Sequence, residues 1–137
     1  MNIVVAFNDT PHGHAAVDAG IAESKLRQAT LHVLHVARVG VRNERPEVIA
    51  HYRRLMENLR ERLAQDGVEG RAEVLLEPHE HGRVLLSVLR DLDADLLVVG
   101  SRHRSPVGKL VLGSTVQHLL LRADCPVLVV RAALKEG

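Results

Sequence analysis

The sequence predicts an α/β fold in which helices cover both faces of a parallel sheet. Short apolar runs rich in β-branched residues alternate with helical patterns along the whole chain. The run at residues 3–7 is continuously apolar, which is typical of a strand that is buried on both faces of a parallel sheet, and the other runs are interpreted in the same way. The order is strand and helix in regular alternation, closed by a fifth strand, so right-handed crossovers would join the strands.

The first half of the chain contains two strands and two helices by this criterion. The first strand is expected at residues 3–7 and the second at 31–36. Between them, apolar residues at spacings of 4, 3 and 4 predict one buried helical face, formed by Ala15, Ala19, Ala22 and Leu26. A longer helix would end near Gly67. Its predicted apolar face consists of Val48, Tyr52, Leu55, Leu59 and Leu63.

The second half repeats the pattern, with strands expected at 72–76, 96–99 and 127–130. The apolar face of the third helix would be Val84, Leu85, Val88, Leu89 and Leu92, and that of the fourth Val116, Leu119, Leu120 and Ala123. Ligands of such sheets bind beyond the carboxyl ends of the strands. The loops to inspect are therefore 8–14, 37–46, 77–82 and 100–114.

Length and composition limit the class of protein. The 137 residues predict a single domain, 1–137, with its own core. A net charge of +1 and a single Phe and Tyr argue against a nucleic-acid partner, and no apolar run is long enough to span a membrane. Cys125 has no second cysteine to pair with, and the N-terminus does not resemble a signal peptide. We therefore expect a cytoplasmic protein in which Cys125 is a small buried thiol.

A glycine-containing segment, 100–115, leaves the fourth strand and enters the fourth helix. Gly100 would let a ligand approach the end of the strand closely. Ser114, followed three residues later by Gln117, matches a capping box and predicts Ser114 as the N-cap. The start of such a helix favours an anion. Positive charges are added by Arg102, Arg104 and Lys109. The segment is not a Walker A loop, because Leu110 stands where Ser or Thr is required.

Five stretches of the chain together resemble the universal stress protein (UspA-type) family. They are residues 3–10, 34–36, 95–101, 112–114 and 125–131. The resemblance covers nearly the whole chain and is most specific from 95 to 131. It implies a flavodoxin-like, five-stranded parallel sheet of order 3-2-1-4-5, in a regulatory domain of the stress response. One branch of the family binds ATP between the first and fourth strands, and another branch does not.

The resemblance implies that an adenine nucleotide, ATP or AMP, binds at the carboxyl ends of the first and fourth strands, with Mg²⁺ as a candidate companion ion. In the pattern G-x2-G-x9-G-[ST] of the ATP-binding branch, Gly100 fits the first glycine and Gly113 with Ser114 fits the last pair. His103 replaces the second glycine and Asn8 the first-strand aspartate, which predicts weaker, altered or absent ATP binding. The candidate ligand-binding residues are Ala6, Asn8, Thr10, Val36, Val99, Gly100, Arg102, His103, Gly113, Ser114 and Thr115.

Two alternative functions stay open. The first is a dimeric stress-response protein that binds no nucleotide, as in the other branch of the family. The second is a nucleotidyltransferase-like enzyme, suggested by His12 and His14. Their spacing of two makes them diverge on a helix, and Thr10 as a cap with Pro11 at the first helical position explains the segment more simply. No clear general base is present, so we assign no catalytic residue and expect at most slow ATP hydrolysis.

Nine histidines are an unusually high number for this length. We expect His12, His14 and His103 to converge at the ligand-binding edge, where they would suit phosphate or a metal, although we assign no metal ligand. At least one of His32 and His35 should pack with a hydrogen-bonded ring. The others are expected near the sheet edge (His79 and His81) or on helix surfaces (His51 and His118).

The last strand predicts how the chain assembles. The strand order implied by the resemblance places 127–130 at an edge of the sheet, where unpaired N–H and C=O groups must be covered. In the family this strand pairs across a two-fold axis. The sequence therefore predicts a homodimer through residues 126–131.

Overall fold

The computed structural model describes residues 1–40, 43–102 and 112–132. In these residues a five-stranded sheet has the order β3-β2-β1-β4-β5, and every pair of neighbouring strands is parallel. The predicted fold class and strand order are therefore confirmed. The strands are β1 (Asn2–Ala6), β2 (Thr30–Arg38), β3 (Gly70–Glu77), β4 (Leu96–Ser101) and β5 (Val127–Arg131).

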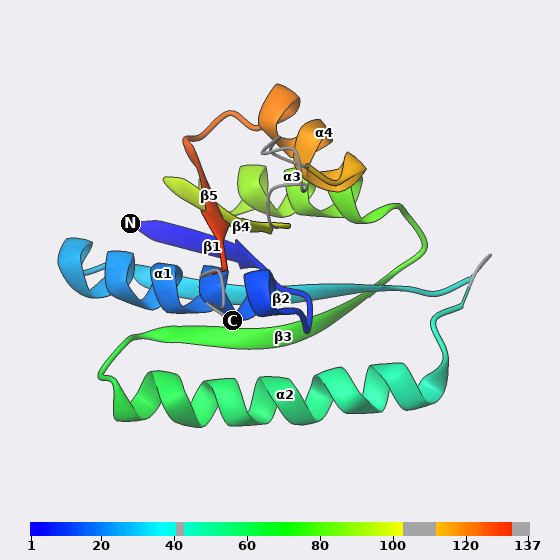
Figure 1. Ribbon diagram of the computed structural model, residues 1–137, viewed down its shortest axis with the longest axis horizontal. Helices are drawn as coiled ribbons and strands as arrows, with labels where there is room; N and C mark the ends of the chain where they lie inside the picture. The colour runs from blue at the N-terminus through cyan, green and yellow to red at the C-terminus, as the bar shows by residue number, and fades with distance from the viewer. Residues whose placement is uncertain (41–42, 103–111, 133–137) are drawn as a thin grey trace, which may run out of the picture.

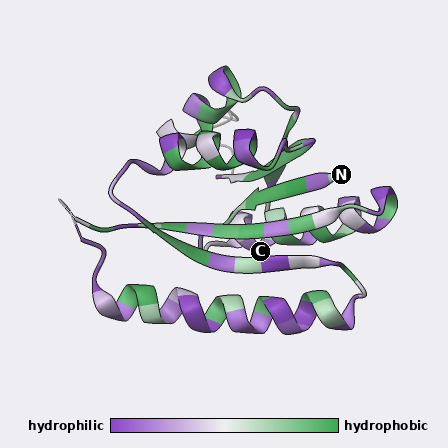
Figure 2. Cartoon of the chain, turned by 180° about the vertical axis from the view of Figure 1, so that it is seen from behind, coloured by the Kyte–Doolittle hydropathy of each residue, from purple (hydrophilic) through white to green (hydrophobic). Residues whose placement is uncertain are grey.

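The helices form one layer on each face of the sheet (Figure 1). They are α1 (Pro11–Arg27), α2 (Pro46–Gln65), α3 (His81–Asp91) and α4 (Ser114–Arg122). A core cluster that includes Phe7, Val17 and Met56 lies on the side of α1 and α2, and a second one that includes Leu85 and Leu119 lies on the side of α3 and α4. Figure 2 shows the apolar strands enclosed between helices whose outer surfaces are polar.

Burial of a strand depends on its place in the sheet. In β1, the side chains of Ile3, Val4 and Val5 are fully buried, because β2 and β4 flank the strand and helices cover both faces. The four valines and leucines of β5 are equally apolar, yet they are only half-buried. Since β5 is an edge strand, the prediction of burial on both faces is wrong there and correct in the centre of the sheet.

The predicted buried face of α1 is wrong in its second half, whereas Ala15 and Ala19 are half-buried and Ala19 packs against the core. Leu26 is 80% exposed, and Ala22 is also exposed. The helix instead turns its smallest residues inward, and its buried residues are Gly13, Ala16, Val17, Gly20, Ile21 and Ser24. The reason is close packing: a Cβ on Gly20 would lie 2.5 Å from Cγ2 of Val5 in β1. Alanines on both sides of the helix made the two faces indistinguishable by periodicity.

The apolar faces of the other helices are largely as predicted. In α2, Leu59 and Leu63 are buried, together with Met56, which the pattern missed. In α3, the buried apolar residues Val84, Leu85 and Leu89 all belong to the predicted face. In α4, Leu119 is buried but Leu120 is 39% exposed, because this nine-residue helix contacts the rest of the protein along a narrow stripe. Within the described ranges, no helix is both long enough and apolar enough to cross a bilayer.

Candidate functional site

A small cleft lies where β1, β2 and β4 end. Six of its lining residues were predicted from the sequence, and they are Ala6, Asn8, Val36, Val99, Gly100 and Thr115. Backbone pairing fixes this convergence, since Ala6 is in register with both Leu34 and Val99. The enclosed volume is only about 80 Å³. Small-molecule sites usually have about 300–1,000 Å³, so a ligand of nucleotide size would have to extend beyond the cleft.

The remaining walls of the cleft were not predicted. They include Phe7, His12 and Gly13 from the start of α1, Leu34 from β2, His81 and Leu85 from α3, and Val116 and Leu119 from α4. His81 was expected only near the sheet edge, and Leu85 only in the core. Their position between the cleft and α3 depends on how α3 packs, which sequence spacing does not reveal. The exception is His12, which was expected to converge at the ligand-binding edge.

Some predicted site residues lie elsewhere. Thr10 is the N-cap of α1, and its Oγ1 accepts a hydrogen bond from the N–H of Gly13 at 3.0 Å, as the simpler interpretation of this segment predicted. Ser114 lines a wider groove between α3 and α4 that adjoins the cleft. Arg102 is exposed and Gly113 is half-buried, and neither lines the cleft. His103 lies outside the described residues.

Gly100 has a structural reason to be glycine. A Cβ at this position would collide with the carbonyl oxygen of His12 and would lie 3.1 Å from the backbone nitrogen of Gly13. The first turn of α1 thus rests directly on the end of β4. The close approach at Gly100 is made by the protein's own backbone, which holds the two strand ends of the cleft together.

The predicted capping box at Ser114 is wrong. The N-cap of α4 is Gly113, and within the described ranges no side-chain hydrogen bond caps the first turn. The side chain of Gln117 donates to the carbonyl of Leu112 at 2.9 Å instead of reaching back to a serine cap. Gly113 has φ −67° and open space around its Cβ direction. The N-cap therefore lies one residue earlier than the sequence predicted. Because glycine has no side chain, the N-cap itself offers no side-chain acceptor to the N–H groups of the first turn.

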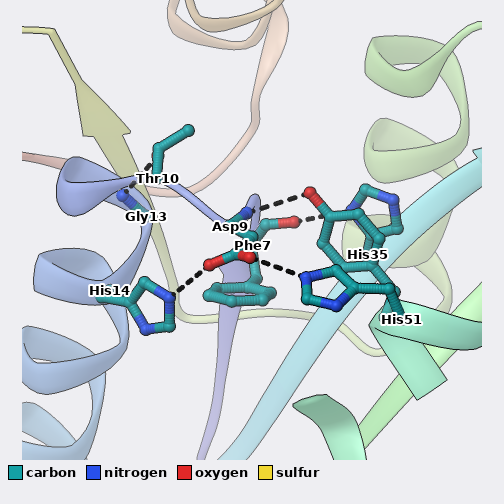
Figure 3. A network of polar contacts seen from close by, with 8 residues as sticks. Phe7, Asp9, Thr10, Gly13, His14, His35 and His51 are labelled. Carbon is teal, nitrogen blue, oxygen red and sulfur yellow. Dashed lines mark hydrogen bonds and ion pairs between the residues drawn. The ribbon is translucent and has the colours of Figure 1, made fainter. Parts of the chain in front are cut away.

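A polar network closes the α1 and α2 side of this edge (Figure 3). The carboxylate of Asp9 accepts hydrogen bonds from Nε2 of His14 and from Nε2 of His51, both at 2.7 Å. The backbone N–H of Asp9 donates to the hydroxyl of Tyr52 at 3.0 Å. Through these contacts Asp9 ties the start of α1 to α2. We call Asp9, His14, His51 and Tyr52, together with Phe7 and His35, the Asp9 network.

The hydrogen bonds to Asp9 hold its pKa below the ordinary value, with that of His51 the larger cause and that of His14 the next. His14 therefore contacts Asp9 and does not line the cleft, so the expected convergence of the histidines holds for His12 and fails for His14. His51 was expected on the surface of a helix, where it is indeed half-exposed. Its partner Asp9 was not predicted, because the two residues are 42 positions apart.

His35 extends the network into the core. Its Nδ1–H donates to the carbonyl of Phe7 at 2.9 Å, and its ring stacks on Tyr52 with centroids 3.4 Å apart. Its other nitrogen, Nε2, is buried without a hydrogen-bond partner among the described residues. Burial is the main reason that the pKa of His35 is lowered. The ring is thus held neutral, because a second proton would place a charge on a buried atom with no acceptor.

His32, on the same strand, is satisfied at both ring nitrogens. Arg71 donates from Nε to Nδ1 at 2.8 Å, so the proton of the neutral ring is on Nε2, which donates to the side chain of Asn2 at 3.0 Å. Burial and then the charge of Arg71 lower the pKa of His32. The expectation of a buried, hydrogen-bonded histidine in this strand is met by both His32 and His35.

Two further sequence expectations concern reactivity. Cys125 is a free thiol that is partly buried, and burial raises its pKa, so the thiolate is disfavoured. In the described part of the chain, no group of three or more His, Cys, Asp or Glu side chains is arranged to hold a metal ion.

The model of the universal stress protein family matches residues 1–131. The chain belongs to the universal stress protein family. It is 40% identical over 139 residues to a universal stress protein of Mycolicibacterium smegmatis, with 94% of this chain and 96% of that protein covered. The structure of a universal stress protein from Archaeoglobus fulgidus superposes with a TM-score of 0.83 at 27% identity, covering 95% and 98% of the two chains.

Some universal stress protein structures with this fold contain a nucleotide. An Archaeoglobus fulgidus protein in complex with dAMP is 21% identical, with a TM-score of 0.77 and coverage of 95% of this chain and 97% of that one. A universal stress protein in complex with cAMP is 19% identical, with a TM-score of 0.71 and coverage of 96% and 98%. An Arabidopsis thaliana member with AMP bound is 19% identical, with a TM-score of 0.68 and coverage of 97% and 92%. At these identities the likeness shows a shared fold.

Proposed function

We propose that this universal stress protein binds an adenine nucleotide as a regulatory ligand in the stress response. The observation that carries the proposal is that the cleft between β1 and β4 borders the start of α4, where Thr115 lines the cleft and Gly113 leaves the first turn without a side-chain cap. The base would enter the apolar cleft beside Ala6 and Val36, and the phosphate would accept hydrogen bonds from the first turn of α4. The relatives that contain dAMP, AMP and cAMP support this choice of ligand.

The departures from the ATP-binding pattern decide which nucleotide is preferred. Asn8 lines the cleft with an amide in place of a carboxylate, so it offers a weaker ligand to Mg²⁺. We therefore propose that a nucleotide with one phosphate, such as AMP or cAMP, needs no metal ion here. The His103 ring would restrict the phosphates of ATP, and His103→Gly should then bind ATP more tightly. Unchanged ATP affinity in that variant would indicate that Asn8, rather than His103, weakens ATP binding.

The test replaces Gly113 with valine. Because its φ of −67° suits any residue and a Cβ would meet nothing within 4 Å, the variant should fold. A valine side chain would occupy the path of the phosphate to the first turn of α4. We expect at least tenfold weaker binding of AMP and cAMP by isothermal titration calorimetry, measured with and without Mg²⁺.

Arg45→Val is the matched control, because Arg45 is also an N-cap with no side-chain hydrogen bond, at the start of α2. It should bind nucleotide like the parent protein. The proposal is wrong if the parent binds none of AMP, cAMP and ATP, or if Gly113→Val binds them as well as Arg45→Val does. The first result would favour the alternative of a universal stress protein that works without a nucleotide.

We also propose that two chains associate through residues 126–131. Val127, Leu128, Val129 and Val130 are apolar and only half-buried at the edge of the sheet. The N–H of Leu97 donates to the carbonyl of Pro126, so the alternation of a parallel ladder directs the N–H of Leu128 toward β4 and that of Val129 toward the free edge.

This alternation separates an assembly defect from a folding defect. Val129→Pro removes an outward N–H and should give a folded monomer by light scattering and circular dichroism. Leu128→Pro removes a hydrogen bond within the sheet and should destabilise the fold itself. A parent protein that stays monomeric at micromolar concentration would refute the dimer.

A further inference from the structure

A groove of about 1170 Å³ runs between α3 and α4 and adjoins the cleft, with which it shares His81 and Thr115. We call it the α3–α4 groove. It is much larger than the cleft, and its walls are basic. Four arginines and two histidines line it, namely Arg38, Arg83, Arg90, Arg122, His81 and His118. Glu80 is the one acidic residue among its described lining residues.

The charge of the groove is not neutralised within the described part of the chain. Arg90 has an ion pair with Asp124 at 3.7 Å, but both side chains are more than half exposed, so the pair is weak. No ion pair among the described residues involves Arg38, Arg83 or Arg122. The Nε atom of Arg38 is buried and has no hydrogen-bond partner there. Since a buried donor without an acceptor is costly, this atom favours a ligand that offers an acceptor oxygen.

The two walls of the groove lie close enough for one ligand to touch both. Gly82 makes this possible, because a Cβ there would lie 2.8 Å from Cδ2 of His118. The helices start at the same end of the groove, and their N-caps, Glu80 and Gly113, make no side-chain hydrogen bond to the first turn. The N–H groups of these first turns, which have no side-chain cap in the described part of the chain, add donors to the positive side chains, although the arginines supply most of the charge.

The spacing of the arginines favours an extended anion. Arg83 lies in the first turn of α3 and Arg90 in its last, about 10 Å apart at 1.5 Å per residue, and Arg122 closes the far end on α4. A single phosphate would reach one end only. Guanidinium groups bind phosphate oxygens in pairs, so arginines in series suit phosphates in series.

We infer that the α3–α4 groove binds a linear chain of phosphate groups. The source is either free polyphosphate or the phosphate tail of a nucleotide whose base occupies the cleft, and this second form rests on the proposed function. In both forms the ligand contacts arginines of α3 and α4 that lie outside the cleft.

The test uses tripolyphosphate as the probe and the double variant Arg83→Gln/Arg122→Gln. Both arginines are exposed, so the variant should fold. We expect tripolyphosphate to bind the parent protein at low salt, to bind at least tenfold more weakly to the variant, and to weaken with added salt for the parent. Arg53→Gln/Arg54→Gln on α2 is the matched control, since it removes the same charge from an exposed surface far from the groove. The single variant Arg90→Gln should give an intermediate loss.

Three ligands distinguish the sources and the competing explanations. AMP should bind the double variant as it binds the parent, so a failure of the groove leaves the proposed function intact. If the double variant binds both ATP and tripolyphosphate more weakly than the parent does, the phosphate tail of a nucleotide is the source. Free polyphosphate is the source if two results are found together. Saturating AMP leaves the affinity for tripolyphosphate unchanged, and the double variant binds ATP as tightly as the parent does.

Two results would overturn the inference. One is no binding of tripolyphosphate and no difference in ATP affinity between the groove variant and the α2 control. The other is tighter binding of a single-stranded oligonucleotide than of tripolyphosphate, which would make the groove a nucleic-acid surface.

Discussion

Polar side chains on the two faces of the sheet are satisfied in different ways. On the side of α1 and α2, Asp9 joins His14, His51 and Tyr52, so the carboxylate and the backbone N–H of Asp9 have their partners in the same chain. On the side of α3 and α4, Arg83 and Arg122 face a groove without an ion-pair partner among the described residues. A cluster whose members pair with one another fixes the positions of helices, whereas the arginines without such a pair are those that we propose to bind an anion.

The starts of the helices show the same contrast. Thr10 caps α1 and accepts the hydrogen bond that a ligand could otherwise have taken. Gly113 supplies no such acceptor to α4. The cleft lies between these two helix starts, and of the two N-caps only Thr10 accepts a side-chain hydrogen bond from its helix.

The largest effect on stability is expected for Gly100→Ala, because the first turn of α1 packs against Gly100 at the end of β4. The added Cβ would collide with the backbone of His12, which cannot move without displacing the helix. We expect a loss of about 2–3 kcal/mol in the free energy of unfolding, measured with urea. Gly113→Ala, at a position with open space, should change stability by less than about 1 kcal/mol. Equal stability of both variants would show that α1 does not rest on Gly100.

The buried histidines of β2 should make the stability of the protein depend on pH. The pKa values of His32 and His35 are lowered in the folded protein, so the unfolded chain binds protons that the folded one does not. Stability is therefore full above about pH 6.5, the unfolded value, and falls as the pH drops toward the folded pKa values. Each group contributes at most about 1.4 kcal/mol per pH unit in this window.

His35→Phe tests this assignment. The phenyl ring can still stack on Tyr52, and the loss of the hydrogen bond to Phe7 adds a penalty that does not depend on pH. Urea unfolding between pH 5 and pH 7.5 should then give a shallower slope than that of the parent protein. His79→Phe, which removes an exposed ring, serves as the control. An unchanged slope in His35→Phe would mean that the pKa of His35 is the same in the folded and unfolded states.

The smallest effect is expected for Asp9→Asn. Its two histidine partners are nearly half-exposed, and such pairs contribute about 0–1 kcal/mol each. Because the pKa of Asp9 is lowered, its contribution is full above the unfolded value of 3.8 and disappears as the pH falls through the lower folded value. The stability difference from the parent should thus be present at pH 6 and absent in strong acid. Asp91→Asn, at an exposed helix end, should show no such difference.

The sequence by itself determined the fold class and the place of the cleft. Short apolar runs such as 3–7 and 96–99 favour strands, and their alternation with helices predicts a parallel sheet whose carboxyl ends meet at one edge. Gly100 follows from that rule, whereas Ala6 and Val99, which pair at the ends of the two central strands, were named as site residues through the family resemblance. Thr10 could be recognised as a cap because its hydrogen bond is local.

Tertiary structure alone decided what depends on distant residues. The buried face of α1 was set by the space above Val5, and Gly113 rather than Ser114 became the N-cap of α4. Residues as distant as Asp9 and His51 were brought together by the packing of α1 and α2 on one face. The α3–α4 groove arises in the same way, since Arg38, Arg83 and Arg122 come from separate elements and no local pattern connects them. Periodicity describes how a segment exposes its own residues, but the neighbour that each residue meets is fixed only when the layers pack.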